Sequence, residues 1–326
     1  MLKLFGTIFL WSALAFTLLQ SIPVFIGHYR RNHYLLACAR PAAFGQFFCI
    51  STAYALLTYA FYISDFSIAY VGMNSHPLLP LMYRLTAVWG GHEGSILFWI
   101  LLINLWTVAF ATLQKRDALM PLTTAVLGMI NLLFLLFLIF TSNPFLAADV
   151  ILTGSDLNPL LQDPGFVIHP PMLYTGYVGF AVTFAITQAA LLRGELTAAW
   201  ASLTRRYALA AWCFLTFGIM LGSWWAYRVL GWGGFWFWDP VENASLLPWL
   251  AGTALIHVLV ICEKRRAALA WAALLALISF ILSLLGTFLV RSGVLISAHT
   301  FASDPSRGLF LLILLAVVLL FHSLFI

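Results

Sequence analysis

Charged residues are scarce in this sequence of 326 residues: Asp, Glu, Lys and Arg make up 8% of it, whereas 63% of the residues are hydrophobic. A soluble domain is roughly one quarter charged. The chain therefore has too few ionic groups to cover a surface that faces water. This excludes a soluble enzyme, a disordered chain and a nucleic-acid-binding module, and it makes the lipid bilayer the solvent for most of the residues.

Cysteine is also scarce, and the four cysteines form no CxxC pair. Their spacing excludes the usual zinc and iron–sulfur sites and an external framework of disulfides. The sequence has no CxxCH motif either. The chain therefore carries no covalently attached haem of its own.

What the sequence has in abundance is long apolar segments. A transmembrane helix needs about 20 apolar residues, and we find nine segments of about that length. They are apolar on all sides, unlike the alternating strands of a membrane barrel. The predicted fold is therefore all-α: a polytopic integral membrane helix bundle, with residues 1–326 forming one membrane domain. The predicted spans are Leu2–Ile26, Ala42–Tyr62, Ser95–Leu113, Met120–Thr141, Met172–Leu192, Ala208–Ala226, Leu246–Cys262, Ala267–Leu289 and Leu309–Ile326.

Charges alternate between the loops that join these spans. One set of short loops holds eleven of the sixteen Lys and Arg residues, and the other set holds eight of the eleven Asp and Glu residues. The positive-inside rule places the first set in the cytoplasm and the N-terminus outside. The net charge of +5 is then a topology signal. Its expected partner is anionic membrane lipid, with no role for nucleic acid.

The external loop predicted at 227–245 carries the strongest chemical signal. Eight of the fifteen residues from Trp224 to Trp238 are aromatic, and three glycines lie among them. An interfacial aromatic belt explains two or three tryptophans per span end but not this density. Glycines let a backbone approach a flat object, and aromatic faces stack on flat apolar ligands. We therefore predict a platform for a planar ligand, formed by Trp224, Trp225, Trp232, Gly233, Gly234, Trp236 and Trp238.

Two histidines lie in external loops on either side of this platform. His169 precedes Pro170 and Pro171, which are predicted to fix the start of the fifth span. His299 lies in the last external loop. Paired imidazoles suit metal ligation, and a flat apolar ligand that takes two axial imidazoles is haem. The alternative interpretation is two ordinary interfacial histidines.

Two further groups belong to the seventh span. Asp239, Pro240 and Glu242 have the spacing of a helix start with a capping box, and Asp239 could also face the ligand. His257 lies within the span, where a titratable group is costly and usually functional. A hydrogen bond from His257 to a neighbouring helix is the alternative.

External arginines are candidate partners for the two propionates of haem. Arg228 and Arg291 lie beside the aromatic loop and the His299 loop, and guanidinium groups pair well with carboxylates. Lipid phosphates or structural acids are the alternative partners. The stretch Gly90–Ser95 is interpreted as a tight turn and helix cap, with a ligand role for His92 as the alternative.

These residues resemble a known family. The segment Trp232–Ala244 resembles the tryptophan-rich WWD signature of the haem-handling superfamily. Three more stretches, Trp89–Ser95, Asp156–Pro164 and His169–Pro171, narrow the resemblance to the CcmF-type cytochrome c haem lyases of System I maturation and their nitrite-reductase-associated paralogues of the NrfE type. The resemblance runs from about residue 40 to the end of the chain.

The resemblance implies an enzyme. It implies that His169 and His299 ligate a haem b held on the aromatic loop, and that the haem vinyl groups are joined to the thiols of a CxxCH motif in apocytochrome c. It also implies that His257 ligates a second haem inside the membrane, which receives electrons from quinol. The implied partners are the haem chaperone CcmE, subunits of the CcmH and CcmI type, and apocytochrome c. The implied location is the bacterial inner membrane, with the active face in the periplasm.

Family members are about twice as long as this chain, and the second ligand of the intramembrane haem is expected further on. A truncated reading frame, a fragment or a subunit completed by another chain would each explain the length. A haem exporter, a non-catalytic assembly scaffold and a quinol-oxidising cytochrome b are the alternative functions. The few polar residues within the spans argue against an exporter. A scaffold would keep its function without His169 and His299.

Overall fold

The structure, a computed structural model, describes residues 1–149, 154–229, 231, 236, 238–295 and 305–323. These residues are almost entirely helical, and the described part contains one isolated antiparallel bridge, between Ile68 and Ala147. Eight helical segments are long and apolar enough to cross a membrane, so the predicted all-α, multi-pass membrane fold is confirmed. They are α1 (Leu2–Tyr29), α2 with α3 (His33–Ala37 and Ala39–Tyr62), α6 (His92–Leu113), α7 (Met120–Thr141), α8 (Pro164–Arg193), α9 (Ala198–Val229), α10 (Pro240–Arg265) and α11 (Leu269–Arg291).

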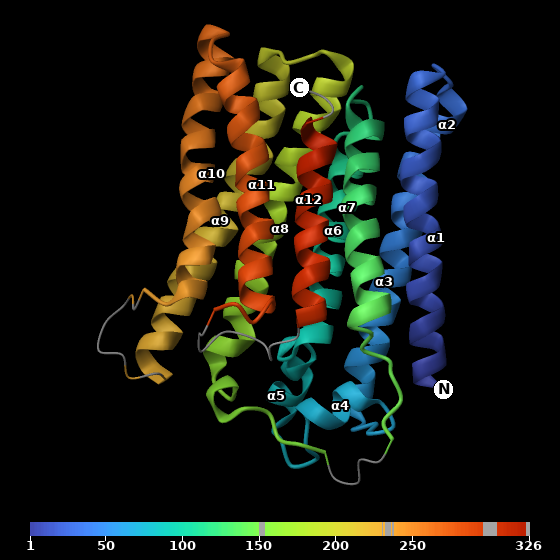
Figure 1. Ribbon diagram of the computed structural model, residues 1–326, viewed down its shortest axis with the longest axis vertical. Helices are drawn as coiled ribbons and strands as arrows, with labels where there is room; N and C mark the ends of the chain where they lie inside the picture. The colour runs from blue at the N-terminus through green and yellow to red at the C-terminus, as the bar shows by residue number, and fades with distance from the viewer. Residues whose placement is uncertain (150–153, 230, 232–235, 237, 296–304, 324–326) are drawn as a thin grey trace.

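The ninth predicted span corresponds to α12 (Pro305–Ser323). Within the described residues its apolar part is Arg307–Leu320, which is shorter than the roughly 20 residues that a membrane span requires. Four short helices complete the described chain, and Figure 1 places α4 and α5 at one end of the bundle. These four are α4 (Ala69–Asn74), α5 (Leu81–Thr86), η1 (Ala87–Trp89) and η2 (Pro159–Leu161).

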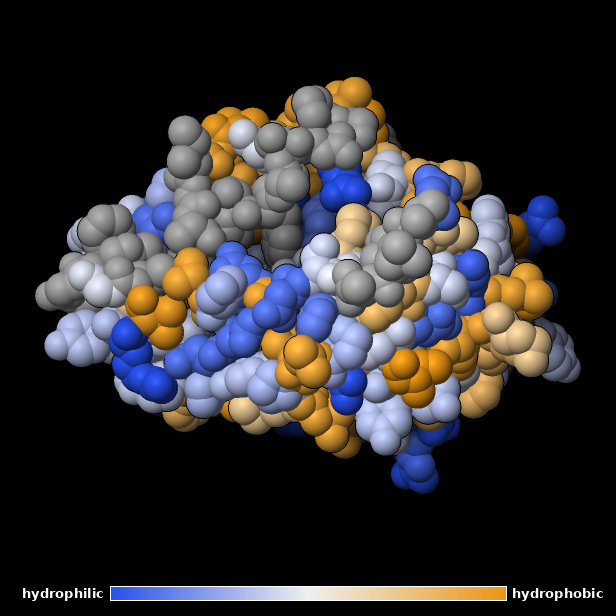
Figure 2. Space-filling view, turned by 90° about the horizontal axis from the view of Figure 1, so that it is seen from below, coloured by the Kyte–Doolittle hydropathy of each residue, from blue (hydrophilic) through white to orange (hydrophobic). Residues whose placement is uncertain are grey.

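The long helices run side by side, so successive connections alternate between the two ends of the bundle (Figure 1). The connections after α1, α6, α8 and α10 lie at the upper end, and these are the loops rich in Lys and Arg. The N-terminus, α4 and α5 lie at the lower end, which Figure 2 shows face on, with a broad band of hydrophilic residues. The two classes of loop identified from charge therefore separate in space. Which end faces the cytoplasm stays a prediction.

Helix α8 is the central helix of the bundle. In its most apolar stretch 83% of the residues are buried inside the protein, against 28% in α9 and 33% in α10. It packs most extensively on α9 and also contacts α6, α7 and α11. A methyl group on Gly176 of α8 would collide with the backbone nitrogen of Leu215, and one on Gly218 of α9 would lie 2.5 Å from the Cα atom of Leu173. Helices α8 and α9 are therefore in backbone contact, as small residues allow in membrane bundles.

These two helices are also longer than a bilayer requires. With 30 residues in α8 and 32 in α9, each is about 45 Å long at a rise of 1.5 Å per residue, whereas the hydrocarbon core is about 30 Å thick. Each helix therefore has residues beyond those needed for one crossing of the hydrocarbon core. The first turns of α8 carry His169, and the last turns of α9 carry Trp224 and Trp225.

The start of α8 differs from the sequence prediction. The prediction that Pro170 and Pro171 begin the fifth span is wrong, because both lie inside α8. The helix begins at Pro164, and the Asp163 carboxylate accepts a hydrogen bond from the backbone N–H of Gly165 (2.7 Å). Pro170 cannot donate to the carbonyl of Phe166. That carbonyl instead accepts a hydrogen bond from the indole N–H of Trp89 (3.3 Å), which lets the helix continue through the proline.

The described aromatic loop is shorter than predicted. The expected range was 227–245, but α9 continues to Val229 and α10 begins at Pro240. At the second boundary the prediction is confirmed, because the Asp239 carboxylate caps α10 by accepting a hydrogen bond from the backbone N–H of Val241 (3.0 Å). Trp232, Gly233 and Gly234 lie outside the described residues, as does His299.

The contact between α8 and α9 makes a stability prediction. Gly176→Leu forces the two backbones apart, and overpacking of this kind costs roughly 1–3 kcal/mol, or a fall of roughly 1–5 °C in the unfolding midpoint of a chain of this size. The midpoint is measured by thermal unfolding of the detergent-purified protein. Phe217→Ala is the matched control on α9, because Phe217 is exposed on the outer surface of the bundle. Equal midpoints for Gly176→Leu and the unchanged protein would contradict the packing argument.

Candidate functional site

A cavity of about 840 Å³ lies at the lower end of the bundle, among the ends of α6, α8, α9, α10 and α11. Its volume is in the upper part of the range for small-molecule and cofactor sites. Seven of the described lining residues carry a Trp, Tyr or Phe ring. The aromatic lining residues are Trp89, Trp99, Phe166, Tyr174, Tyr177, Trp225 and Trp236.

His169 lies in the wall of this cavity and is oriented by a hydrogen bond to α9. Its Nδ1 atom lies 2.8 Å from the carbonyl oxygen of Gly218 on α9. A carbonyl only accepts, so the ring must donate from Nδ1, and in the neutral imidazole the lone pair is then on Nε2. Histidines that bind metals are commonly oriented in this way, by a hydrogen bond from the second ring nitrogen.

Glycine on α9 makes the position of His169 possible. A Cβ atom on Gly222 would lie 2.5 Å from the Cε1 atom of His169. Gly218 supplies the carbonyl and Gly222, one helical turn further on, supplies the space. In the same region, a Cβ atom on Gly165 would lie 2.5 Å from Cγ of Trp225. Close packing of the α8 and α9 backbones therefore places both the imidazole and the indole.

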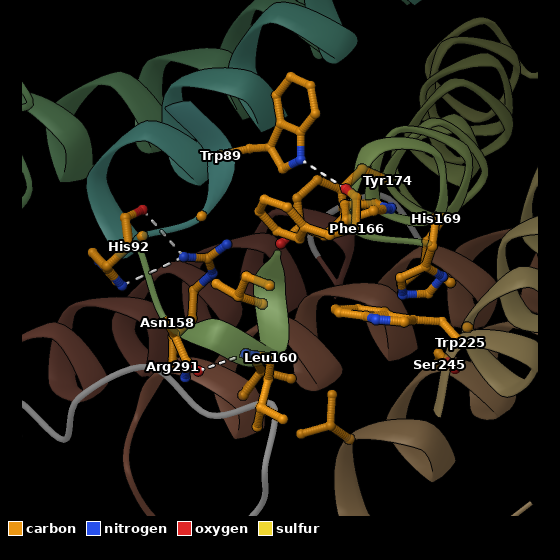
Figure 3. A pocket seen from close by; sticks show the side chains of 18 of the residues that line it. Trp89, His92, Asn158, Leu160, Phe166, His169, Tyr174, Trp225, Ser245 and Arg291 are labelled. Atoms are coloured by element: carbon orange, nitrogen blue, oxygen red, sulfur yellow. Dashed lines mark hydrogen bonds between the residues drawn. The ribbon is translucent and has the colours of Figure 1, made fainter. Parts of the chain in front are cut away.

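Aromatic rings continue from His169 along one wall, as Figure 3 shows. The ring of Trp225 lies 5.8 Å from that of His169 and 6.1 Å from that of Phe166, both tilted. Phe166 in turn lies 6.3 Å from Trp89, which stacks on Phe98. Such a surface suits the face of a flat apolar ligand. Trp236 also lines the cavity, so two of the predicted platform tryptophans do so.

The opposite wall is polar and contains Arg291, which is only 2% exposed (Figure 3). Its guanidinium donates to the hydroxyl of Ser95 (3.0 Å) and to the carbonyl of His92 (3.4 Å). It also lies 3.4 Å from Nδ1 of His92. Since a guanidinium only donates, Nδ1 accepts, and Nε2 of His92 donates to the Ser142 hydroxyl (2.9 Å).

A second arginine lies on the same side of the cavity. Arg307 of α12 forms an ion pair with Glu93 of α6 at 2.8 Å, and both side chains line the cavity. His92, interpreted from sequence as part of a turn and cap, is the first residue of α6 and is buried. The cavity is therefore two-sided, with an imidazole and aromatic rings on one wall and arginines on the other.

Several predicted ligand-binding residues lie outside this cavity. Arg228 pairs with Asp163 (3.2 Å) and lies over the Trp224 ring, 4.5 Å from its centre. Trp238 is 71% exposed. Neither Arg228, Trp224, Trp238 nor Asp239 is among the residues that line the cavity. Helical phase is the reason for Trp224, since its neighbour Trp225 takes the inward position.

His257 is also separate from the cavity. It is exposed on α10, and its Nδ1 atom donates to the carbonyl of Thr253 one turn earlier (2.8 Å). This hydrogen bond lies within α10, so it is not the bond to a neighbouring helix that was the alternative for His257. The hydrogen bond leaves the ring lone pair on Nε2, on the outside of the helix.

The sequence analysis missed lining residues that helical periodicity could have identified. Positions three, four and eight residues apart share one face of a helix. Starting from His169, this rule selects Phe166, Leu173 and Tyr177, and all three line the cavity. Asn158 and Leu160 also line the cavity, but they lie before α8 and outside its helical periodicity, so this rule could not select them.

The chain is similar to known cytochrome c assembly proteins. The family model described as "Cytochrome C assembly protein" matches residues 89–296. The protein named "Cytochrome c-type biogenesis protein CcmF" in Pseudomonas aeruginosa is 54% identical over 96% of this chain, and that of Escherichia coli is 50% identical over 94%. The "Probable cytochrome c-type biogenesis protein NrfE" of Escherichia coli is 48% identical over 84% of the chain.

A solved structure is similar as well. The structure titled "Cytochrome c Heme Lyase CcmF" superposes with a TM-score of 0.80 and 33% sequence identity, and the match covers 99% of this chain and 51% of that one. The chain spans about half the length of the curated relatives that it matches, 48% of both CcmF proteins and 50% of NrfE. With a family model that covers most of its length and with these relatives, the chain belongs to the cytochrome c assembly protein family, as a member of the CcmF and NrfE type.

Proposed function

We propose that this chain acts as a haem lyase, and that its cavity holds the substrate haem and presents it for attachment to apocytochrome c. The observation that carries the proposal is the hydrogen bond from Nδ1 of His169 to the carbonyl of Gly218. It directs the lone pair of a cavity-lining imidazole to Nε2, the atom that an axial haem ligand uses. The aromatic rings beside it offer apolar surface for stacking against a porphyrin.

His299 is proposed as the second axial ligand, with Trp225 and Trp236 as the stacking surface. We further propose that Trp232, Gly233 and Gly234 extend this surface. The roles of these three residues and of His299 are proposed from the sequence alone. Thioether formation adds the sulfur of a thiol to one vinyl carbon and the thiol hydrogen to the other. It has no leaving group and needs no oxidant. The protein's task is therefore to bind, orient and expose the substrate.

Arg291 is proposed as the partner of a haem propionate. It is buried in the wall opposite His169, and its hydrogen bonds to Ser95 and His92 aim the guanidinium along that wall. A buried guanidinium favours a carboxylate more strongly than an exposed one does. Arg228 suits this role less well because Asp163 already pairs with it outside the cavity.

His257 is proposed as a ligand of a second haem within the membrane. Its Nε2 atom is on the exposed side of α10, inside a span. A second ligand would then come from protein that covers this face. Electrons from quinol would reach that haem and keep the substrate iron reduced.

The proposed setting is the bacterial inner membrane with the cavity on the periplasmic side. CcmE as haem donor, CcmH- and CcmI-type subunits and apocytochrome c are the proposed partners. Apocytochrome supplies the thiols. A haem exporter is a weaker candidate because the cavity lies at one end of the bundle and its described lining belongs to that end. A scaffold would not need an oriented imidazole in an aromatic cavity.

The ligand assignment predicts that His169→Ala and His299→Ala each change the bound haem from a six-coordinate low-spin form to a five-coordinate high-spin form. Each should also lower haem occupancy by at least about tenfold. The measurement is the visible spectrum and the pyridine haemochrome content of the purified protein, with the yield of cytochrome c in cells. His33→Ala is the control, because His33 is exposed at the other end of the bundle. Unchanged spectra and yield in both alanine variants would refute the proposed function.

The space beside His169 gives a separate prediction. Gly222→Val places methyl groups where the imidazole lies, so the ring must leave the carbonyl of Gly218. Haem occupancy should fall about as far as in His169→Ala, although both histidines are retained. Gly231→Val is the comparison, since no atom of the described residues lies within 4 Å of a Cβ at that glycine, although its positive φ strains the backbone. Normal occupancy in Gly222→Val would show that the orientation of His169 is unimportant.

The propionate assignment predicts a change in ligand preference. The unchanged protein should bind haem roughly 10- to 100-fold more tightly than haem dimethyl ester, which corresponds to one charge-assisted hydrogen bond. In Arg291→Gln this preference should disappear, whereas Arg291→Lys should keep part of it. The two affinities are measured by titration of haem-free protein. If the ratio of the affinities for haem and haem dimethyl ester is the same in all three proteins, Arg291 is excluded as the propionate partner.

A further inference from the structure

The two ends of the segment that carries His299 are tied to one turn of α6. Arg291, the last residue of α11, donates to Ser95 and to the carbonyl of His92. Arg307, in the first turn of α12, pairs with Glu93. The three contacted residues lie within the first turn of α6. Ion pairs and hydrogen bonds from both sides of residues 292–306 therefore converge on four consecutive positions.

The two ends also touch each other directly. A Cβ atom on Gly308 would lie 3.1 Å from Cβ of Ser292, so the first residue after α11 and the first turn of α12 are in contact. Helices α11 and α12 pack together beyond this point. The intervening segment starts and ends at the same place, beside the polar wall of the cavity.

The turn of α6 is itself firmly held. The Tyr70 hydroxyl on α4 donates to the carbonyl of Val88 (2.9 Å) and accepts from the backbone N–H of Gly91 (3.0 Å). Burial raises the pKa of Tyr70 well above its ordinary value, so the phenol keeps the proton that it donates. Gly94 has no room for a side chain, because a Cβ atom there would collide with the carbonyl of Val88. This turn does not shift easily to follow a moving partner.

The contact between Glu93 and Arg307 differs from an ordinary surface ion pair. Each of the two side chains is 19% exposed, whereas Arg193 and Glu195 in a loop are 30% and 45% exposed. Partial burial weakens solvent screening, so the pair is stronger than exposed pairs, which contribute little. This ion pair also joins a side chain of α12 to a side chain of the α6 turn.

We propose that the turn His92–Ser95 acts as a two-point clamp that positions the His299 segment relative to His169, with Glu93, Arg291 and Arg307 as positioning residues. The proposal rests on the proposed function, because it assigns the clamp to the second axial ligand. Closing a chain segment at both ends removes most of the arrangements open to it. A binding site needs its ligands held in place by a supporting layer of contacts. The clamp gives the motif Trp89–Ser95 a role beyond capping a helix.

The test uses the pair Glu93 and Arg307, because neither is a proposed haem ligand. Glu93→Gln and Arg307→Gln are each expected to weaken haem binding by about tenfold and to reduce the six-coordinate low-spin fraction of the haem that remains bound. Combining the two should cost no more than either alone, since both remove the same contact. The exchanged pair, Glu93→Arg with Arg307→Glu, should recover most of the affinity and of the low-spin spectrum.

Arg205→Gln is the matched control. It breaks a pair of similar length, Arg205 with Glu263 at 3.0 Å, with side-chain exposures of 35% and 18%, at the far end of α9 and α10. Its haem spectrum and affinity should equal those of the unchanged protein. An effect as large as that of Glu93→Gln would mean that any lost ion pair disturbs the fold, and the clamp would be rejected.

A measurement without haem separates this proposal from the proposed function. Amide hydrogen exchange in peptides covering 292–306 of the haem-free protein should be about tenfold faster in each single variant and should return to its original rate in the exchanged pair. If the unchanged protein binds no haem, the proposed function fails while this measurement still tests the clamp. Unchanged exchange, additive losses in the double variant, or no recovery in the exchanged pair would each overturn the clamp.

Discussion

The backbone contact between α8 and α9 is the constraint on which the rest of the site depends. Gly176 against Leu215 and Gly218 against Leu173 bring the two helices closer than side chains would allow. Lipid tails are as apolar as leucine, so hydrophobic burial does not drive helices together in a bilayer, and close backbone packing is one interaction that does. Only at this separation can Nδ1 of His169 reach the carbonyl of Gly218. Packing and site chemistry therefore share the same glycines.

The arrangement also explains how a protein with few charged residues can handle a reactive, amphipathic substrate. Haem has an apolar face and carboxylates at one edge, and the cavity has aromatic rings on one wall and Arg291 on the other. The proposed addition of a thiol to a vinyl group has no leaving group and needs no oxidant, so it asks little of the protein beyond placing the reactants. Orientation is then the protein's main contribution. Helices α8 and α9 supply it, because His169 lies near the start of α8 and Trp225 near the end of α9.

The distribution of polar groups separates structural from functional roles. Asp239 and Asp163 cap α10 and α8, and Asp163 also pairs with Arg228 outside the cavity. Arg291 and His92, by contrast, are buried in the cavity wall, where polar groups are costly unless they bond to one another or to a ligand. His257 has a third position, exposed within a span. Such a group is costly in lipid, which favours a role that involves another surface.

Sequence alone determined the fold class, the membrane location of most of the chain and the separation of basic and acidic loops. Those features depend on composition and on the thickness of a bilayer, which act on each segment independently. It also selected His169, Trp225, Trp236 and Arg291 as candidates, since aromatic density, imidazole and external arginine stand out in an apolar chain, and all four line the cavity. Tertiary structure decided which of the candidates share a cavity. It placed Trp225, but not Trp224, in the cavity wall, and it paired Arg228 with Asp163 outside the cavity. It also joined Arg291 to a histidine 199 positions away in sequence. Contacts of this kind depend on helix phase and on how closely two backbones approach, and neither is contained in local sequence.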